Sequence, residues 1–145
     1  MTQGDTMSFD GNLLRKVTHE LNDKIVTGRI TKIYQLSAYD LLFMIHANKE
    51  KQQLLISASP NYARIHLTEF NHERPATPPN FCMFLRKYLE GGIIQSIHQN
   101  ENDRVIVFTI EKRNELGDKT LKKLIVEVTG RHANIIVTDH DYKIL

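Results

Sequence analysis

The chain has 145 residues, 41% hydrophobic and 25% charged, which is the composition of one soluble globular domain with its own core. Its formal net charge of +2 excludes a polybasic protein that binds nucleic acid through its overall field, so any such contact must come from a local patch. The single cysteine, Cys82, excludes an intrachain disulfide, and no apolar stretch approaches the roughly 20 residues of a membrane span.

The first residues, 1–6, contain neither a basic nor an apolar block and therefore do not resemble a signal peptide. We expect 1–6 to be a disordered leader or a cloning remnant ahead of Met7, and 7–145 to be one domain. These features predict a cytoplasmic protein with no membrane partner.

A helix is predicted next, with Asp10 as its N-cap and Gly28 ending it in the left-handed conformation that glycine adopts at low cost. Four short strands should follow, at Arg29–Leu36, Asp40–His46, Gln53–Ser57 and Ala63–Leu67. Residues 48–51 are polar and predict a hairpin loop, so sequential antiparallel pairing is favoured over crossover connections.

A second helix is predicted after Thr77-Pro78-Pro79, with the threonine hydroxyl as its cap and Gly91-Gly92 at its end. Cys82 within it is most simply a small buried thiol. Its buried face should consist of the apolar residues Phe81, Phe84, Leu85, Tyr88 and Leu89.

Four more strands are predicted at Ile93–Gln99, Arg104–Lys112, Leu121–Val128 and Asn134–Asp139. Two helices and about eight strands in this order indicate an α+β fold built as an antiparallel β-sandwich. The seven histidines show no zinc-binding spacing, and no catalytic motif is complete, so we expect no metal, no cofactor and no catalytic residue.

Asp103-Arg104 is the most informative pair, because it ends a polar stretch and opens the apolar run from Val105 to Ile110. Arg104 shares strand parity with Ile106 and Phe108, so its stem should follow the bulky apolar face while its guanidinium reaches the rim. From the residues alone a structural role is favoured, with Asp103 holding the turn. RNA recognition is the alternative.

Gly130-Arg131-His132 lies between two predicted strands and suits a tight turn with polar residues at its tip. The functional alternative is a phosphate contact from Arg131, assisted by His132.

Several segments in order resemble the N-terminal NFACT domain of the fibronectin-binding protein A family, also called the RqcH family, whose eukaryotic relatives are Rqc2 and NEMF. The resemblance spans about residues 7–145. The segments are Met7 to Gly11, Gly28 to Ile30, Ser57 to Thr68, Pro78 to Gly92, Asn102 to Arg104, and Glu127 to Ile136.

The resemblance implies a fold similar to the N-terminal domain of formamidopyrimidine-DNA glycosylase (MutM-like). It implies no such chemistry, because Ser8-Phe9 follows Met7 in place of the catalytic proline and glutamate. It also implies a factor of ribosome-associated quality control, which binds the stalled large ribosomal subunit with its peptidyl-tRNA and recruits tRNA for alanine tailing. The family's tRNA-binding Asp-Arg dipeptide matches Asp103 and Arg104. We expect Arg131 and His132, from the turn considered above, to be secondary RNA contacts.

Three positions depart from the family pattern, which commonly has histidine at Ser59, methionine at Asn80 and serine at Ala133. A role that needs histidine at position 59 therefore does not carry over. Family members continue into helix-hairpin-helix, coiled-coil and C-terminal domains, so this chain resembles an excised domain. Two other classes remain open: a surface adhesin with fibronectin as its partner, and a glycosylase-like enzyme.

Overall fold

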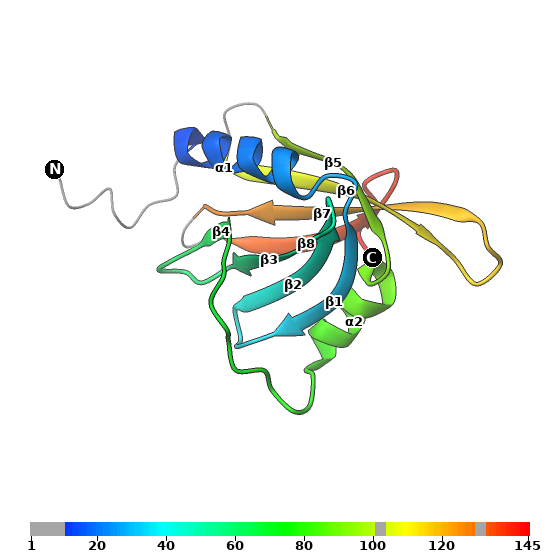
Figure 1. Cartoon of the computed structure of the whole chain (residues 1–145), viewed down its shortest axis with the longest axis horizontal. Coiled ribbons are helices and arrows are strands. Elements are labelled where there is room, and N and C mark those ends of the chain that lie inside the picture. The colour runs from blue at the N-terminus through cyan, green and yellow to red at the C-terminus, as the bar shows by residue number, and fades with distance from the viewer. Residues whose placement is uncertain (1–10, 101–103, 130–132) are drawn as a thin grey trace, which may run out of the picture.

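The computed structural model of the chain describes residues 11–100, 104–129 and 133–145, and Figure 1 shows their arrangement. Within these ranges two helices and eight strands occur, in the order expected from the sequence. The elements are α1 (Gly11–Lys24), β1 (Arg29–Gln35), β2 (Asp40–Ala47), β3 (Glu50–Ser57), β4 (Arg64–Leu67), α2 (Asn80–Leu89), β5 (Ile93–Gln99), β6 (Val105–Arg113), β7 (Lys119–Glu127) and β8 (Asn134–Asp139).

The strands form one antiparallel sheet in the order β4-β3-β2-β1-β5-β6-β7-β8. The α+β class and the antiparallel pairing are thus confirmed. The sandwich is corrected, because the strands make one continuous sheet and not two separate ones. Its two halves join at β1 and β5 through the single register pair Arg29↔Ile93, and the sheet turns there so that both halves contribute to one core.

The helices complete this core. Helix α1 packs on β5 and β4, whereas α2 packs on β1 and β6, as the two views show. In α1 the side chains of Leu14, Thr18 and Leu21 are buried, three to four residues apart, which is the spacing of one helix face. The other face of α1 is left to solvent.

The end of α1 differs from the prediction. Thr27, with φ of 73°, takes the left-handed conformation that was expected of Gly28. Glycine is required at position 28 for a different reason, namely close packing. A Cβ atom there would lie 2.7 Å from the Cβ atom of Ala47 and 2.9 Å from the Ile25 carbonyl oxygen.

Helix α2 begins at Asn80 with Pro79 as its N-cap and no side-chain cap hydrogen bond, so the predicted cap by Thr77 is wrong. The predicted buried face is confirmed in part. Cys82, Leu85 and Leu89 are buried, as predicted. Phe84 and Tyr88 are partly buried against the core and lie edge to face at 5.0 Å, whereas Phe81 is exposed and was wrongly assigned to the buried face.

The hairpin between β2 and β3 is tighter than the predicted loop of residues 48–51. Asn48 and Lys49 alone connect the strands, with φ of 52° and 64°. Positive φ at both central residues is the two-residue turn whose twist matches that of paired strands. The hairpin fixes the register Ala47↔Glu50, and Ala47 is the residue against which Gly28 packs.

Candidate nucleic-acid interface

The loop after β5 and the loop after β7 lie at the same end of the sheet, because β5, β6, β7 and β8 are successive antiparallel neighbours. The backbone N–H of Val128 donates to the carbonyl oxygen of Arg104 at 2.9 Å, one residue beyond the register pair Val105↔Glu127. The turn before β6 and the turn after β7 are the two that the sequence analysis identified as candidate RNA contacts. Arg104 and Val128, which flank these turns, are therefore neighbours.

Arg104 occupies a bend directly before β6 and its side chain is exposed. Among the described residues, its guanidinium has no hydrogen-bond or ion-pair partner. Behind it, Ile106 and Phe108 are at most 1% exposed, which agrees with the predicted bulky buried face of the strand. A charged head group is thus held at the rim by a rigid, buried element.

The remaining candidates, Asp103, Arg131 and His132, lie outside the described residues. The residues next to them belong to the described ranges. Asn100 donates its N–H to the carbonyl oxygen of Val105 at 3.0 Å and closes the base of the first turn. Ala133, after the second turn, is partly buried against the core.

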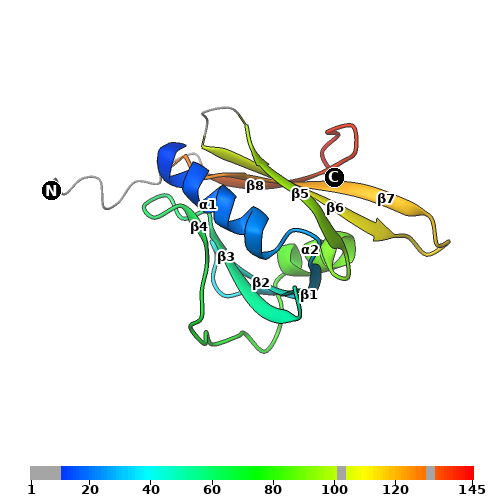
Figure 2. The same cartoon turned by 45° about the horizontal axis from the view of Figure 1, so that its top comes forward.

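The N-terminal end of α1 lies at the same rim, which the sequence reasoning did not anticipate. The Gln99 side-chain amide donates to the Gly11 carbonyl oxygen at 3.1 Å, and the Asn22 amide donates to the Ile97 carbonyl oxygen at 2.9 Å. Helix α1 therefore runs antiparallel to β5, as Figure 2 shows.

The outer face of α1 carries Arg15, Lys16 and His19, all of them exposed. Arg15 also donates to the Asn12 side chain at 3.4 Å. The signal for this surface was in the sequence, because these three residues complement the buried spacing of Leu14 and Leu21. Arg15 and Lys16 add two positive charges near the N-terminal end of α1, while Glu20 and Asp23 are the exposed acidic residues further along the helix.

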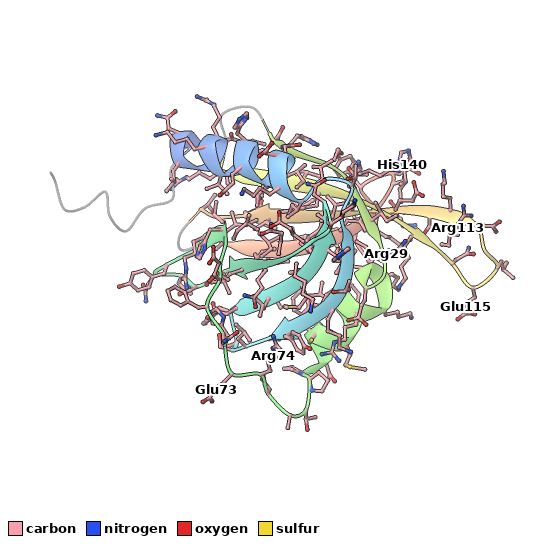
Figure 3. All side chains as sticks on the ribbon, viewed as in Figure 1. Arg29, Glu73, Arg74, Arg113, Glu115 and His140 are labelled. Atoms are coloured by element: carbon pink, nitrogen blue, oxygen red, sulfur yellow. The ribbon has the colours of Figure 1, made fainter. Side chains whose placement is uncertain are left out.

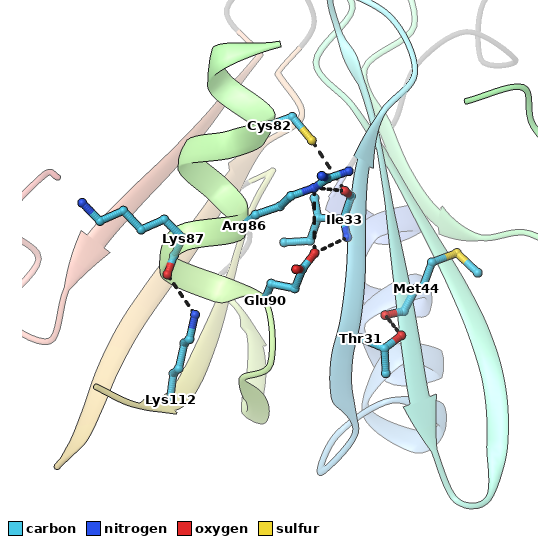
Figure 4. A network of polar contacts seen from close by, with 8 residues as sticks. All are labelled: Thr31, Ile33, Met44, Cys82, Arg86, Lys87, Glu90 and Lys112. Carbon is cyan, nitrogen blue, oxygen red and sulfur yellow. Dashed lines mark hydrogen bonds and ion pairs between the residues drawn. The ribbon is translucent and has the colours of Figure 1, made fainter. Parts of the chain in front are cut away.

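Arg86, a basic residue in the last turn of α2, is structural. Its Nε donates to the Ile33 carbonyl oxygen at 2.8 Å and lies 3.8 Å from Oε2 of Glu90, which accepts the Ile33 N–H at 3.1 Å (Figure 4). The Cys82 thiol reaches the same Ile33 carbonyl oxygen at 3.5 Å. These contacts fasten α2 to β1 and leave Arg86 little freedom to bind a ligand.

Within the described ranges, no group of three or more His, Cys, Asp or Glu side chains could hold a metal ion. The described helices include none that is long and apolar enough to cross a membrane.

Several known proteins resemble this chain in sequence and in fold. A family model described as NFACT N-terminal and middle domains matches residues 10–145. The chain is 53% identical over 133 residues to the Rqc2 homolog RqcH of Bacillus subtilis, covering 92% of this chain and 23% of that protein. It is 31% identical over 132 residues to ribosome quality control complex subunit NEMF of Homo sapiens, covering 91% of this chain and 11% of that protein.

The crystal structure of the N-terminal domain of fibronectin-binding protein PavA from Streptococcus pneumoniae superposes with a TM-score of 0.91 at 45% identity. The match covers 95% of this chain and 52% of that one. The chain spans about a quarter of the length of the bacterial relatives that it matches, 23% and 25% for the Bacillus subtilis and Streptococcus pneumoniae RqcH proteins. By family match, sequence identity and fold alike, this chain belongs to the NFACT N-terminal domain family.

Proposed function

We propose that this chain is the tRNA- and ribosome-facing module of a ribosome quality control factor in the cytoplasm. In this role it contacts tRNA beside the stalled large ribosomal subunit, and the tRNA supplies alanine for tailing the nascent chain. The supporting comparison is that relatives sharing 31% to 53% identity are named RqcH and NEMF, the latter a ribosome quality control complex subunit.

The observation that carries the proposal is the exposed guanidinium of Arg104 at the start of β6, without a protein partner among the described residues. A guanidinium in this position can make charge-assisted hydrogen bonds to a phosphate or to a base edge. In the proposal Asp103 orients Arg104 or accepts a hydrogen bond from a base, while Arg131 and His132 add phosphate contacts from the neighbouring turn.

The geometry suits RNA because RNA is recognised largely through its loops and its shape. A few side chains fixed on a rigid sheet can read an exposed loop without a deep cleft. Arg15 and Lys16 on α1 extend the positive surface along the rim. The role is a binding role in which no residue acts as a catalyst, and the likeness to the glycosylase N-terminal domain is proposed for the fold alone.

The experiment compares the Asp103→Ala/Arg104→Ala variant with a matched control, Glu73→Ala/Arg74→Ala. The control removes the same two kinds of charge from adjacent exposed residues in the connection before α2 (Figure 3). Binding of fluorescent tRNA is measured by anisotropy. We expect at least a tenfold loss of affinity for the first variant and less than a twofold loss for the control.

Alanine tailing is tested in Bacillus subtilis by exchanging the matching N-terminal segment of RqcH for this chain. The hybrid protein should still add alanine tails to stalled nascent chains. The same hybrid with Asp103→Ala/Arg104→Ala should add none. Equal tRNA affinity and equal tailing with and without the dipeptide would overturn the assignment.

Fibronectin binding is the second candidate, favoured by the structural similarity to PavA, which is named a fibronectin-binding protein. Saturable binding of the chain to immobilised fibronectin, together with its digestion by protease added to intact cells, would support this candidate. A protein that is protected until the cells are lysed would exclude it.

A further inference from the structure

A second basic surface lies at the other end of β6, far from Arg104. It is a hollow of about 520 Å³ between the C-terminal end of α2 and the β6–β7 hairpin. The nine residues of β6 separate the two places by about 30 Å, since each strand residue advances about 3.3 Å. The hollow is lined by Lys87, Tyr88, Lys112, Arg113, Asn114, Glu115, Leu116, Thr120 and Lys122.

The charge of this hollow is strongly one-sided. Four cationic side chains line it against one carboxylate, that of Glu115, although the whole chain carries a net charge of only +2. Within the part of the chain that the structure describes, the only ion pairs are Arg86–Glu90 and Lys119–Glu111. Neither pair includes any of the four cations, and the charge of Glu90 acts on Lys112 alone among them, so Lys87, Arg113 and Lys122 keep a positive charge that a ligand can meet.

The sheet register brings two of the lysines together. Lys112 pairs with Thr120, and Ile110 pairs with Lys122, so Lys112 and Lys122 are diagonal neighbours on one face of the hairpin. Diagonal neighbours in a sheet are about 7–8 Å apart. The Lys112 ammonium donates to the Lys87 carbonyl oxygen at 2.9 Å, which ties this face to the last turn of α2 (Figure 4).

Tyr88 arranges the ammonium groups without neutralising them. The Nζ atoms of Lys87 and Lys122 lie 5.2 Å and 6.0 Å from the centre of its ring. A cation–π contact holds an ammonium group in place and leaves its full charge and its hydrogen-bond donors available. The ring is itself held edge to face by Phe84 at 5.0 Å.

Lys112 is partly withdrawn from water in the free protein. Burial is the largest influence and lowers the pKa of Lys112, the charge of Glu90 raises it, and the charge of Lys122 lowers it to a smaller extent. Like charges held together on a rigid surface are relieved when an anion binds between them. A ligand with several negative charges along its length suits a hollow bordered by a helix on one side and a hairpin on the other.

We propose that the hollow between α2 and the β6–β7 hairpin is a second RNA-binding site, in which Lys87, Lys112 and Lys122 hold consecutive phosphates of an RNA backbone. It is separate from the Asp103-Arg104 rim and does not depend on it. Arg113, at the projecting end of the hairpin (Figure 3), and Leu116, in the β6–β7 turn, also line the hollow. The site recognises the spacing of the backbone phosphates and not the base sequence.

The test measures anisotropy of a fluorescent single-stranded RNA with the whole chain and three variants over a range of salt concentrations. Lys87→Gln/Lys122→Gln removes two pocket cations, and Lys49→Gln/Lys51→Gln removes two exposed cations at the β2–β3 hairpin as a matched control. Asp103→Ala/Arg104→Ala removes the rim dipeptide. Thermal melting confirms that each variant is folded.

We expect the pocket variant to lose at least tenfold in affinity, and its log–log salt slope to fall by about 1.4, since each lost phosphate contact on a single strand contributes about 0.7. The control should lose less than twofold. The rim variant should retain the part of the binding that depends on the pocket, so failure of this site and failure of the proposed tRNA contact can be told apart.

Two further measurements use the unmodified chain. RNA should protect Lys87 and Lys122 from acetylation more strongly than Lys49 and Lys51, as read by mass spectrometry. Inorganic phosphate and poly-glutamate of equal charge should compete at least tenfold more weakly than RNA. Absence of protection, equal loss in the pocket and control variants, or equal competition by poly-glutamate would overturn the proposal.

Discussion

Gly28 packs directly against Ala47, so closely that a Cβ atom on the glycine would lie 2.7 Å from the alanine Cβ atom. Real carbon atoms do not approach to this distance without a shift of the structure. Gly28 follows α1 and Ala47 ends β2, and Ile94 donates its N–H to the Gly28 carbonyl oxygen at 2.9 Å. The contact therefore lies where both halves of the sheet meet the helix.

Gly28→Ala should destabilise the fold by about 1–3 kcal/mol, the usual cost of overpacking a well-packed interior. Urea unfolding measures the loss. The double variant Gly28→Ala/Ala47→Gly should recover only part of the stability, because the Ile25 carbonyl oxygen and Ile45 Cγ2 would still lie 2.9 Å from the new methyl group. An unchanged unfolding midpoint for the single variant would contradict the expectation.

Glu90 connects α2 to β1, since its carboxylate accepts the Ile33 N–H and lies beside Arg86. Glu90→Ala should cost about 1–3 kcal/mol of stability, because it leaves a partly buried N–H without its acceptor. Glu90→Gln keeps an acceptor oxygen and should cost less. Chemical unfolding of the two variants decides the matter, and an equal loss in both would show that the hydrogen bond is unimportant.

Lys112 should make stability depend on alkaline pH. Partial burial lowers its pKa in the folded chain below the ordinary value of 10.5. The unfolded chain therefore binds the proton more tightly, and protonation of Lys112 destabilises the fold at every pH below the lowered pKa. This loss of stability disappears as the pH rises from the lowered pKa to the ordinary pKa of lysine.

The Lys112→Met variant isolates this effect, because other titrating groups largely cancel in the difference from the unmodified chain. The free energy of unfolding of the unmodified chain should rise relative to the variant as the pH approaches the ordinary lysine pKa of 10.5 from below. Urea midpoints measured across this range test it. A relative decrease would mean that the charged amine is stabilised in the fold.

Cys82 should be chemically inert in the folded chain. Its side chain is fully buried, and its sulfur contacts the Ile33 carbonyl oxygen. A thiol-specific chromogenic reagent should therefore react with it slowly in buffer and rapidly in denaturing urea, with glutathione as the reference for a free thiol. Rapid reaction without denaturant would show that α2 detaches from β1 in the native state.

The sequence predicted the elements well because their signals are local. Alternating apolar residues and a polar turn are enough to define the β2–β3 hairpin. The prediction for the end of α1 was wrong, because the conformation of Thr27 and the close packing of Gly28 depend on strands that lie far along the chain. The prediction that Thr77 caps α2 was also wrong. The N-cap residue is Pro79, which has no side-chain oxygen to accept a hydrogen bond.

The other features that the sequence did not predict depend on contacts between residues far apart in the chain. The pairing of Arg29 with Ile93, which makes one sheet of eight strands, leaves no local mark in either segment. The placement of α1 beside Gln99 is likewise tertiary, so Arg15 and Lys16 could not be assigned to the Asp103-Arg104 rim from the sequence. The hollow around Tyr88 needs both the helix and the diagonal register of β6 and β7.

The two outermost strands, β4 and β8, form the two edges of the sheet, and these edges determine how readily the chain aggregates at high concentration. An unpaired strand edge is a template for adding another chain, and short or covered edges reduce that risk. β4 has only four residues. Along β8, the Leu145 N–H donates to the Val137 carbonyl oxygen at 3.0 Å, and Thr138 bridges to Ile144. The C-terminal residues thus occupy part of the β8 edge and shield it from uncontrolled self-association.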